Sequence, residues 1–323
     1  MHLRKRVLVT GGAGFLGSHL CQRLVERGDD VLCADNFFTG TKDNIIDLLE
    51  KPNFELMRHD VTCPLYVEVD EIYNLACPAS PVHYQHDPVQ TTKTSVHGAI
   101  NMLGLAKRTG AKIFQASTSE VYGTAIYTPI DEAHPLQGQS PYSASKAAGD
   151  LMAESFHKSF ELPIVILRPF NTYGPRQSER AVIPTIIRQV IDPACDVIRV
   201  GDLSPKRDFN FVEDTVAAFI AAAILPDTAN GEVFNAGSGH MVTIEETLAQ
   251  IIELTGSTKN VVREEKRVRP EKSEVLTLMA NTEKLKAISP WRPETDLSQG
   301  LQKTIDWWSE RTNNLRPSSE YMR

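Results

Sequence analysis

The sequence predicts an α/β protein built on a doubly wound, Rossmann-type parallel sheet, with a smaller substrate lobe toward the carboxyl end. Three observations lead to this fold class. Short apolar runs alternate with helical patterns through the first 170 residues, a glycine-rich turn separates the first run from the first helix, and the alternation becomes irregular after residue 171. Strands that alternate with helices favour a parallel sheet covered on both faces, and 323 residues suffice for two lobes.

Each expected element follows from the spacing of its apolar residues. The expected strands are Val7–Thr10, Val31–Ala34, Phe54–Met57, Glu71–Leu75, Lys112–Ala116 and Ile164–Arg168. The expected helices are Leu16–Arg27, Val96–Thr109 and Ser143–Ser159, followed in the second region by Val212–Ile224 and Ile244–Leu254. Proline and glycine interrupt the pattern beyond residue 171, so this second region is expected to lie against the carboxyl ends of the strands.

The turn after the first strand carries glycines at Gly11, Gly14 and Gly17. Glycine allows a tight turn and close approach to a pyrophosphate, while the following helix offers unpaired N–H groups to an anion. The second strand ends at Asp35, about 20 residues on, where a carboxylate accepts hydrogen bonds from a ribose diol and repels a 2′-phosphate. The unit therefore predicts NAD rather than NADP, against the alternative of a turn that serves only packing.

Composition narrows the class of function. The net charge of −7 argues against a nucleic-acid partner, and no apolar run approaches the ~20 residues that span a bilayer. Five dispersed cysteines lack the spacing of a metal site, so no metal is expected. An odd cysteine count without a secretory segment is typical of reduced thiols, and we expect a cytoplasmic location.

A candidate catalytic set centres on Tyr142 and Lys146, which share one face of the expected helix. An ammonium beside a phenol stabilises the phenolate, which can then act as a general base on a sugar hydroxyl. In isolation such a pair is more often a solvated surface pair. Here it follows a strand that ends just before Thr118 and Glu120, so we assign all four as catalytic: Thr118 shares the hydroxyl proton and Glu120 moves a second one.

Together GGAGFLG, Asp35, TSEVYG and YSASK resemble the extended short-chain dehydrogenase/reductase superfamily, and its nucleotide-sugar branch fits best. The resemblance implies a tightly held NAD that oxidises the sugar at C4, with Thr118, Tyr142 and Lys146 as the oxidation triad. Lys146 would also contact the nicotinamide ribose. The resemblance places these further residues at the cofactor: Phe15, Leu16, Asn36, Asp60, Val61, Leu75 and Ala76.

The two halves resemble different members of that branch. From Val7 to Gly123, strings such as DNFFTG and TTKTSVHGAINMLGLAKR resemble bacterial UDP-glucuronate decarboxylases. Beyond Gly123, strings such as PYSASK and RPFNTYGPR resemble the NAD-dependent 4,6-dehydratases of the legionaminic acid pathway. Many sugar 4,6-dehydratases place an aspartate after the catalytic threonine, whereas this chain has Ser119. Decarboxylation of UDP-glucuronate is thus our leading prediction, with 4,6-dehydration, 4-epimerisation and a non-enzymatic NAD-binding role as alternatives.

The resemblance also implies contacts to a nucleotide-sugar substrate, with UDP favoured as the nucleotide. Arginine suits phosphate because its planar fork binds two oxygens. The expected substrate residues are Pro81, Tyr84, Ser119, Asn171, Arg176, Arg207 and Arg269. We expect residues 1–172, joined by 206–236, to form the NAD-binding domain, and residues 173–205 and 237–323 to form the nucleotide-sugar lobe. The superfamily implies a homodimer through the helices near Val96–Thr109 and Ser143–Ser159.

Overall fold

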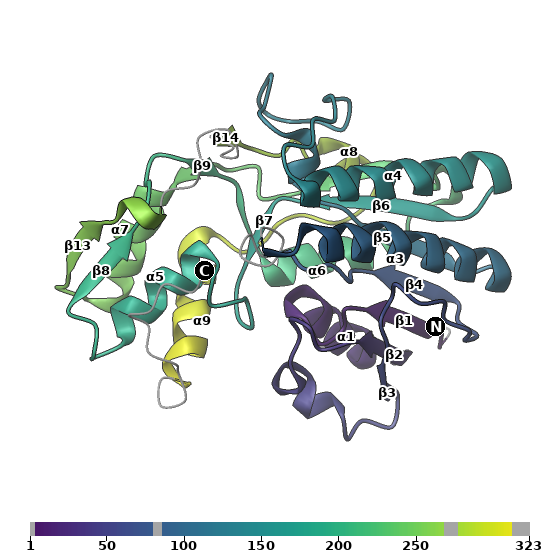
Figure 1. Ribbon diagram of the computed structural model, residues 1–323, viewed down its shortest axis with the longest axis horizontal. Coiled ribbons are helices and arrows are strands. Elements are labelled where there is room, and N and C mark those ends of the chain that lie inside the picture. The colour runs from purple at the N-terminus through teal and green to yellow at the C-terminus, as the bar shows by residue number, and fades with distance from the viewer. Residues whose placement is uncertain (1–3, 80–85, 268–276, 312–323) are drawn as a thin grey trace.

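A computed structural model describes residues 4–79, 86–267 and 277–311 of the chain (Figure 1). Its centre is a seven-stranded, all-parallel sheet in the order β11-β6-β5-β4-β1-β2-β3. The strand order reverses between β1 and β4, so the crevice beyond their carboxyl ends is where an open α/β sheet binds its ligand. The seven strands are β1 (Arg6–Thr10), β2 (Asp30–Asp35), β3 (Phe54–Arg58), β4 (Glu71–Asn74), β5 (Lys112–Ala116), β6 (Ile164–Pro169) and β11 (Val233–Ala236).

The predicted doubly wound fold is confirmed, and all six predicted strands are present with ends shifted by at most one residue. The seventh strand, β11, comes from the irregular second region and pairs with β6 at the edge of the sheet. Helix α3 (Pro88–Thr109) begins eight residues before the predicted Val96. Asp87 caps its amino terminus through the Gln90 N–H, and Pro88 occupies the first turn, where a missing N–H costs nothing.

Both faces of the sheet are covered by helices (Figure 1). Alternate residues of a strand point to opposite faces, so Leu8 packs toward α3 and α4 (Pro141–Phe160), whereas Val7 and Val9 face the opposite layer. That opposite layer holds α1 (Phe15–Arg27) and α6 (Val212–Ala223). Its apolar cluster continues into the carboxyl-terminal region, so one core joins the sheet to that region.

The carboxyl-terminal region places short helices and strands to one side of the sheet (Figure 1). Its α5, α7 and α9 bury apolar residues into the shared core. The elements described in this region are β7 (Asn171–Tyr173), α5 (Val182–Ile191), β8 (Val197–Val200), β9 (Lys206–Arg207), β10 (Phe209–Phe211), β12 (Val242–Thr243), α7 (Ile244–Thr255), β13 (Asn260–Arg263), β14 (Thr277–Leu278), α8 (Glu283–Ile288) and α9 (Leu297–Ser309). Short 3-10 helices in the described part of the chain are η1 (Lys42–Leu48), η2 (Ser119–Tyr122), η3 (Asp227–Ala229) and η4 (Glu265–Arg267).

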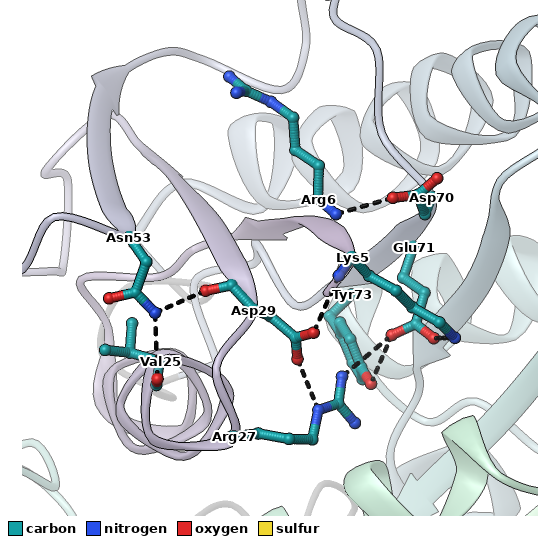
Figure 2. Close-up of polar contacts among 9 residues, drawn as sticks. All are labelled: Lys5, Arg6, Val25, Arg27, Asp29, Asn53, Asp70, Glu71 and Tyr73. Atoms are coloured by element: carbon teal, nitrogen blue, oxygen red, sulfur yellow. Dashed lines mark hydrogen bonds and ion pairs between the residues drawn. The ribbon is translucent and has the colours of Figure 1, made fainter. Parts of the chain in front are cut away.

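A buried charge cluster holds the amino ends of the strands together (Figure 2). The carboxylate of Asp29, which is 0% exposed, accepts hydrogen bonds from the Lys5 backbone N–H and the Arg27 side chain. Glu71 is 1% exposed and pairs with the side chains of Lys5 and Arg27, while the Tyr73 hydroxyl donates to it. These bonds connect α1, β1 and β4 at the edge opposite to the strand ends that carry the expected site.

Candidate active site

The glycine turn at the carboxyl end of β1 has the geometry that the sequence predicts. Gly11 has a φ of +68°, and its N–H donates to the Ala34 carbonyl at 2.8 Å. A Cβ added at Gly17 would lie 2.1 Å from the Gly11 carbonyl oxygen, so only glycine fits there. Gly14 precedes α1 and no side chain caps this helix. The turn is therefore a close-packed backbone cradle that leads into a helix amino terminus, which suits a pyrophosphate.

Asp35 braces this turn from the end of β2. Its Oδ2 accepts the Ala13 N–H at 2.9 Å and its Oδ1 accepts the Phe37 N–H at 2.8 Å. Burial raises the pKa of Asp35, and the two backbone donors oppose that rise. A carboxylate offers about four lone-pair sites, so each oxygen keeps one for a further donor such as a ribose hydroxyl.

The other expected cofactor residues lie along the same crevice. The Thr10 hydroxyl accepts the backbone N–H groups of Leu75 at 3.1 Å and Ala76 at 3.2 Å, which fixes the chain leaving β4 beside the glycine turn. Gly11 and Ala76 touch, because a Cβ added at Gly11 would lie 2.9 Å from the Ala76 Cα. The remaining positions are Phe15 and Leu16 in the first turn of α1, Asn36 bonded to Asp60 at 3.1 Å, and Val61, which is 4% exposed.

Asp60 is held in its charged form by its neighbours. Burial opposes ionisation, but bonds from the Thr62 N–H, the Thr62 hydroxyl and Asn36 outweigh it and lower the pKa of Asp60. The carbonyl of the next residue, Val61, accepts a 2.7 Å bond from Asn101 of α3. These contacts fix the loop that follows β3 above the crevice.

The four expected catalytic residues lie on α4 and on the segment after β5, which pack together. Ser140 caps α4 through a capping box with Ser143, so the helix starts just before Tyr142. Tyr142 is 6% and Lys146 is 5% exposed. The Lys146 ammonium donates a 2.8 Å hydrogen bond to the Ala116 carbonyl, two residues before Thr118.

Thr118 starts the single turn η2, and its hydroxyl accepts the Glu120 N–H at 3.2 Å. Ser119, the first residue of η2, is buried, with 3% of its surface exposed. The helix that carries Tyr142 and Lys146 therefore meets the segment that carries Thr118 and Glu120 at the carboxyl end of β5. A tyrosine and a lysine one helical turn apart are residue types that suit proton removal from an alcohol.

The expected substrate residues are spread more widely. Asn171 opens β7, and its Oδ1 is buried with no hydrogen-bond partner among the described residues. Arg176 bonds Gln22 of α1 at 3.1 Å, while its Nη1 is likewise buried with no partner in the described part of the chain. Arg207 lies in β9, 8% exposed, and donates to the Lys206 carbonyl at 3.0 Å. Pro81, Tyr84 and Arg269 lie outside the described residues.

Sequence reasoning did not single out Ser117, Asp150 and Arg168, which form a buried polar network beneath the catalytic set. The Asp150 carboxylate is 0% exposed and accepts the Ser117 hydroxyl at 2.7 Å and the Arg168 Nε at 3.0 Å. One signal was available, because Asp150 follows Lys146 by four residues and so shares its helix face. Its arginine partner is 18 positions away, which no local pattern reveals.

Two further searches cover the described residues alone. Within residues 4–79, 86–267 and 277–311, no cluster of three or more His, Cys, Asp or Glu side chains could hold a metal ion. Every helix in that part of the chain is too short or too polar to cross a bilayer.

Comparisons with known proteins show the family to which the chain belongs. A family model described as GDP-mannose 4,6 dehydratase matches residues 8–304. A UDP-glucuronic acid decarboxylase 6 from Arabidopsis thaliana is 40% identical over 305 residues, which is 92% of this chain and 86% of that protein. That alignment is much longer than the segment ending at Gly123, so the similarity to decarboxylases extends into the second half.

Solved structures share the fold over nearly the whole chain. The dTDP-glucose 4,6-dehydratase of Bacillus anthracis in complex with NAD is 28% identical with a TM-score of 0.86, covering 97% of this chain and 99% of that one. The UDP-glucuronic acid 4-epimerase of Bacillus cereus in complex with UDP-glucuronic acid and NAD has the same two values, covering 94% and 99%. The chain therefore belongs to the GDP-mannose 4,6 dehydratase family, in the nucleotide-sugar branch of the extended short-chain dehydrogenase/reductases.

Proposed function

We propose that this protein is an NAD-dependent nucleotide-sugar enzyme that decarboxylates UDP-glucuronate after oxidation at C4. The observation that carries the proposal is the buried Lys146 ammonium, bonded to the Ala116 carbonyl one helical turn from Tyr142 and beside the segment that bears Thr118. A protein that only bound NAD would have no use for this arrangement. The similarity to decarboxylases over 92% of the chain supports the choice of substrate.

The glycine turn, Asp35 and the Thr10-braced backbone of Leu75 and Ala76 fit NAD. The absence of a side chain at Gly11 and Gly17 leaves the backbone open to a pyrophosphate, and Asp35 keeps lone pairs for a ribose diol. When bound, NAD accepts a hydride from the sugar and can later return it. We assign Lys146 to the nicotinamide ribose, and Asp60 and Val61 to the adenine end.

Tyr142 and Thr118 handle the proton of the C4 hydroxyl. We assign Tyr142 as the base that removes it, with the Lys146 ammonium stabilising the phenolate and Thr118 sharing a hydrogen bond with the same hydroxyl. Oxidation leaves a 4-keto sugar that carries a carboxylate on C5. When CO2 departs, the C5–C6 electron pair stays on C5 and delocalises into the keto group, and C5 then takes up a proton. This step needs no acid to expel a leaving hydroxide.

Ser119 favours decarboxylation over 4,6-dehydration, whereas Glu120 does not. A dehydratase must protonate the departing 6-hydroxyl, and Ser119 stands where many sugar 4,6-dehydratases carry an aspartate. Glu120 is nevertheless present and would serve a dehydratase as the base at C5, so 4,6-dehydration of a nucleotide-linked hexose is the second candidate. A 4-epimerase would need only the residues assigned to oxidation at C4, which are Thr118, Tyr142 and Lys146.

Two buried polar atoms without partners support a substrate site in the second region. Asn171 Oδ1 and Arg176 Nη1 are both buried with no hydrogen-bond partner among the described residues, which an incoming sugar hydroxyl and phosphate would supply. We assign Arg207 to the nucleotide as well. The domain division at residues 172 and 206–236 belongs to the same proposal, with UDP as the favoured nucleotide.

We further propose a cytoplasmic homodimer. All five cysteines are free, as is usual in a reducing compartment. The outer faces of α3 and α4 expose Ile100 at 45% and Leu151 at 57%, and these helices pack side by side (Figure 1). A second copy that presents the same two helices would cover both side chains.

Product mass tests the reaction. The purified protein is incubated with UDP-glucuronate and, separately, with UDP- and GDP-N-acetylglucosamine, and the products are weighed. A loss of about 44 mass units from UDP-glucuronate, the mass of CO2, is the expected result. A loss of about 18, the mass of water, from a hexosamine substrate instead would establish the dehydratase.

A further inference from the structure

A buried ion pair lies directly beneath the catalytic set. Arg168, at 2% exposed, donates from Nε to Asp150 Oδ2 at 3.0 Å, and its Nη2 forms an ion pair with the same oxygen at 3.0 Å. The second oxygen, Oδ1, is buried with no hydrogen-bond partner among the described residues. Neither residue belongs to the cofactor or substrate contacts assigned above, so the pair has a separate explanation.

Stability alone is a weak reason for such a pair. Taking two charges out of water costs about as much as their attraction returns, and buried pairs can often be replaced by apolar side chains without loss of stability. The orphaned Asp150 oxygen makes the balance less favourable still. The remaining explanation is that the pair holds neighbouring elements in a fixed arrangement. Its hydrogen-bond partners indicate which elements these are.

The ion pair is hydrogen-bonded to residues at both ends of the segment that runs from Ser117 through η2 to Tyr122. The Ser117 hydroxyl, immediately before Thr118, donates to Asp150 Oδ2 at 2.7 Å. At the other end of η2, the Tyr122 hydroxyl accepts Arg168 Nη1 at 3.1 Å and donates to Asn235 Oδ1 of β11 at 2.7 Å. Burial raises the pKa of Tyr122 to about 12, so this phenol keeps its proton and can serve as that donor.

The same carboxylate is fixed to the catalytic helix. Asp150 follows Lys146 by one turn of α4, and the two side chains interact electrostatically. The ion pair thus connects the helix that carries Tyr142 and Lys146 to both flanks of the segment that carries Thr118 and Glu120. The bond between Lys146 and the Ala116 carbonyl joins the same two elements.

We propose that Asp150, paired with Arg168, is a positioning residue: through Ser117 and Tyr122 it sets the distance between the tyrosine–lysine pair on α4 and the threonine–glutamate turn after β5. The inference rests on the proposed function, since it assigns these four residues to one reaction. It predicts that loosening the network lowers the rate of the chemical step while leaving substrate and NAD bound.

Ser117→Ala is the mildest test, because it removes one hydrogen bond and leaves the ion pair intact. We expect kcat to fall about tenfold, with KM and the NAD content of the purified enzyme within twofold of wild type. Ser155→Ala is the matched control, since Ser155 lies farther along α4 and bonds only the Met152 carbonyl at 2.8 Å. An unchanged kcat in Ser117→Ala overturns the proposal, as does a rise in KM that accounts for the whole loss.

Asp150→Asn tests the pair itself against a second buried carboxylate. Glu71→Gln also breaks a buried ion pair with an arginine, but at the opposite edge of the sheet (Figure 2). We expect Asp150→Asn to lower kcat at least a hundredfold and Glu71→Gln to leave the kcat of the folded fraction within threefold. Equal losses in the two variants would show that Asp150 acts only through stability.

Amide hydrogen exchange separates this inference from the proposed function. The Glu120 N–H bonds the Thr118 hydroxyl and the Gly123 N–H bonds the Glu120 carbonyl, so both report on the turn. Ser117→Ala should speed exchange in residues 118–123 about fivefold, as expected from the loss of one hydrogen bond. If wild type turns over none of the test substrates, the proposed function fails while this readout stands. Unchanged exchange contradicts the positioning role even in an active enzyme.

Discussion

The ammonium of Lys146 donates a 2.8 Å hydrogen bond to the carbonyl of Ala116, the last residue of β5. This bond fixes a helix side chain to the end of a central strand, at the edge where parallel sheets bind their ligands. An ammonium has three protons, so two remain for the phenol of Tyr142 and for a ligand. Lys146 is 5% exposed, so this bond gives its buried Nζ a polar partner.

Tyr142→Phe tests the assigned base. Removing the phenol oxygen should lower kcat by at least about a thousandfold, because general-base catalysis contributes roughly 10² to 10⁴. NAD content should not change, since the ring still packs in place. Tyr127→Phe is the control, because Tyr127 is exposed and bonds only Asp131 in its own loop. Full activity in Tyr142→Phe would remove Tyr142 from the mechanism.

Gly17→Ala tests the pyrophosphate cradle. The new methyl group would lie 2.1 Å from the Gly11 carbonyl oxygen, so the turn must move. We expect purified protein with less than a tenth of the NAD of wild type, measured by absorbance after denaturation. In Gly104→Ala the added carbon meets nothing within 4 Å, and the same measurement should match wild type. Normal NAD content in Gly17→Ala would place the cofactor elsewhere.

Glu120→Gln distinguishes the two candidate reactions. A dehydratase needs a base at C5, so the substitution should lower its kcat by at least a hundredfold. Loss of CO2 generates the C5 electron pair directly, and a decarboxylase should lose less than tenfold. Our proposal predicts the smaller loss with UDP-glucuronate. The reverse pattern, with a severe loss on a hexosamine substrate that the wild type dehydrates, would favour dehydration.

Sequence patterns predicted most strands of the sheet, because a buried strand needs a short apolar run that is visible along the chain. The first strand and the glycine turn could be predicted from an apolar run and from glycines, which allow a positive φ such as the +68° found at Gly11. The sequence did not predict β11, because its four residues form a strand only by pairing with β6, which is far away in the sequence. The Asp150–Arg168 pair escaped for the same reason. Candidate catalytic residues could be named from the sequence, but the network that contacts their segments depends on tertiary contacts.

Leu151→Asp tests the proposed dimer. Each copy would bury one Leu151, so in a two-fold interface the substitution introduces two aspartates. Burying such a side chain is worth about 2 kcal/mol, so the variant should dissociate at micromolar concentration. Sedimentation should give about 72 kDa for wild type, twice the chain mass of 35.9 kDa, and a single-chain mass for the variant. Ile224→Asp alters another exposed side chain, outside these helices, and should remain dimeric. A single-chain mass for wild type would refute the dimer.

His19 makes stability depend on pH. Burial lowers the pKa of His19 to about 4 from its ordinary 6.5, and Arg176 lowers it further, against the Pro175 carbonyl that bonds its ring nitrogen at 2.9 Å. Below pH 6.5 the unfolded chain takes up a proton that the folded chain refuses until about pH 4. Stability is therefore present above pH 6.5 and lost as the pH falls toward 4.

Substitution of His19 isolates its contribution to the loss of stability at low pH. Between pH 7 and pH 5, wild type should lose about 2 kcal/mol more of its unfolding free energy than His19→Asn, given about 1.4 kcal/mol per unit of pKa shift. Urea unfolding followed by tryptophan fluorescence at the two pH values measures this difference. Other titrating groups act equally in both proteins and cancel. His240→Asn replaces an exposed imidazole and should track wild type at both values. If His19→Asn shows the same pH dependence as wild type, His19 takes up its proton over the same pH range in the folded and unfolded chain, and burial does not lower its pKa as proposed.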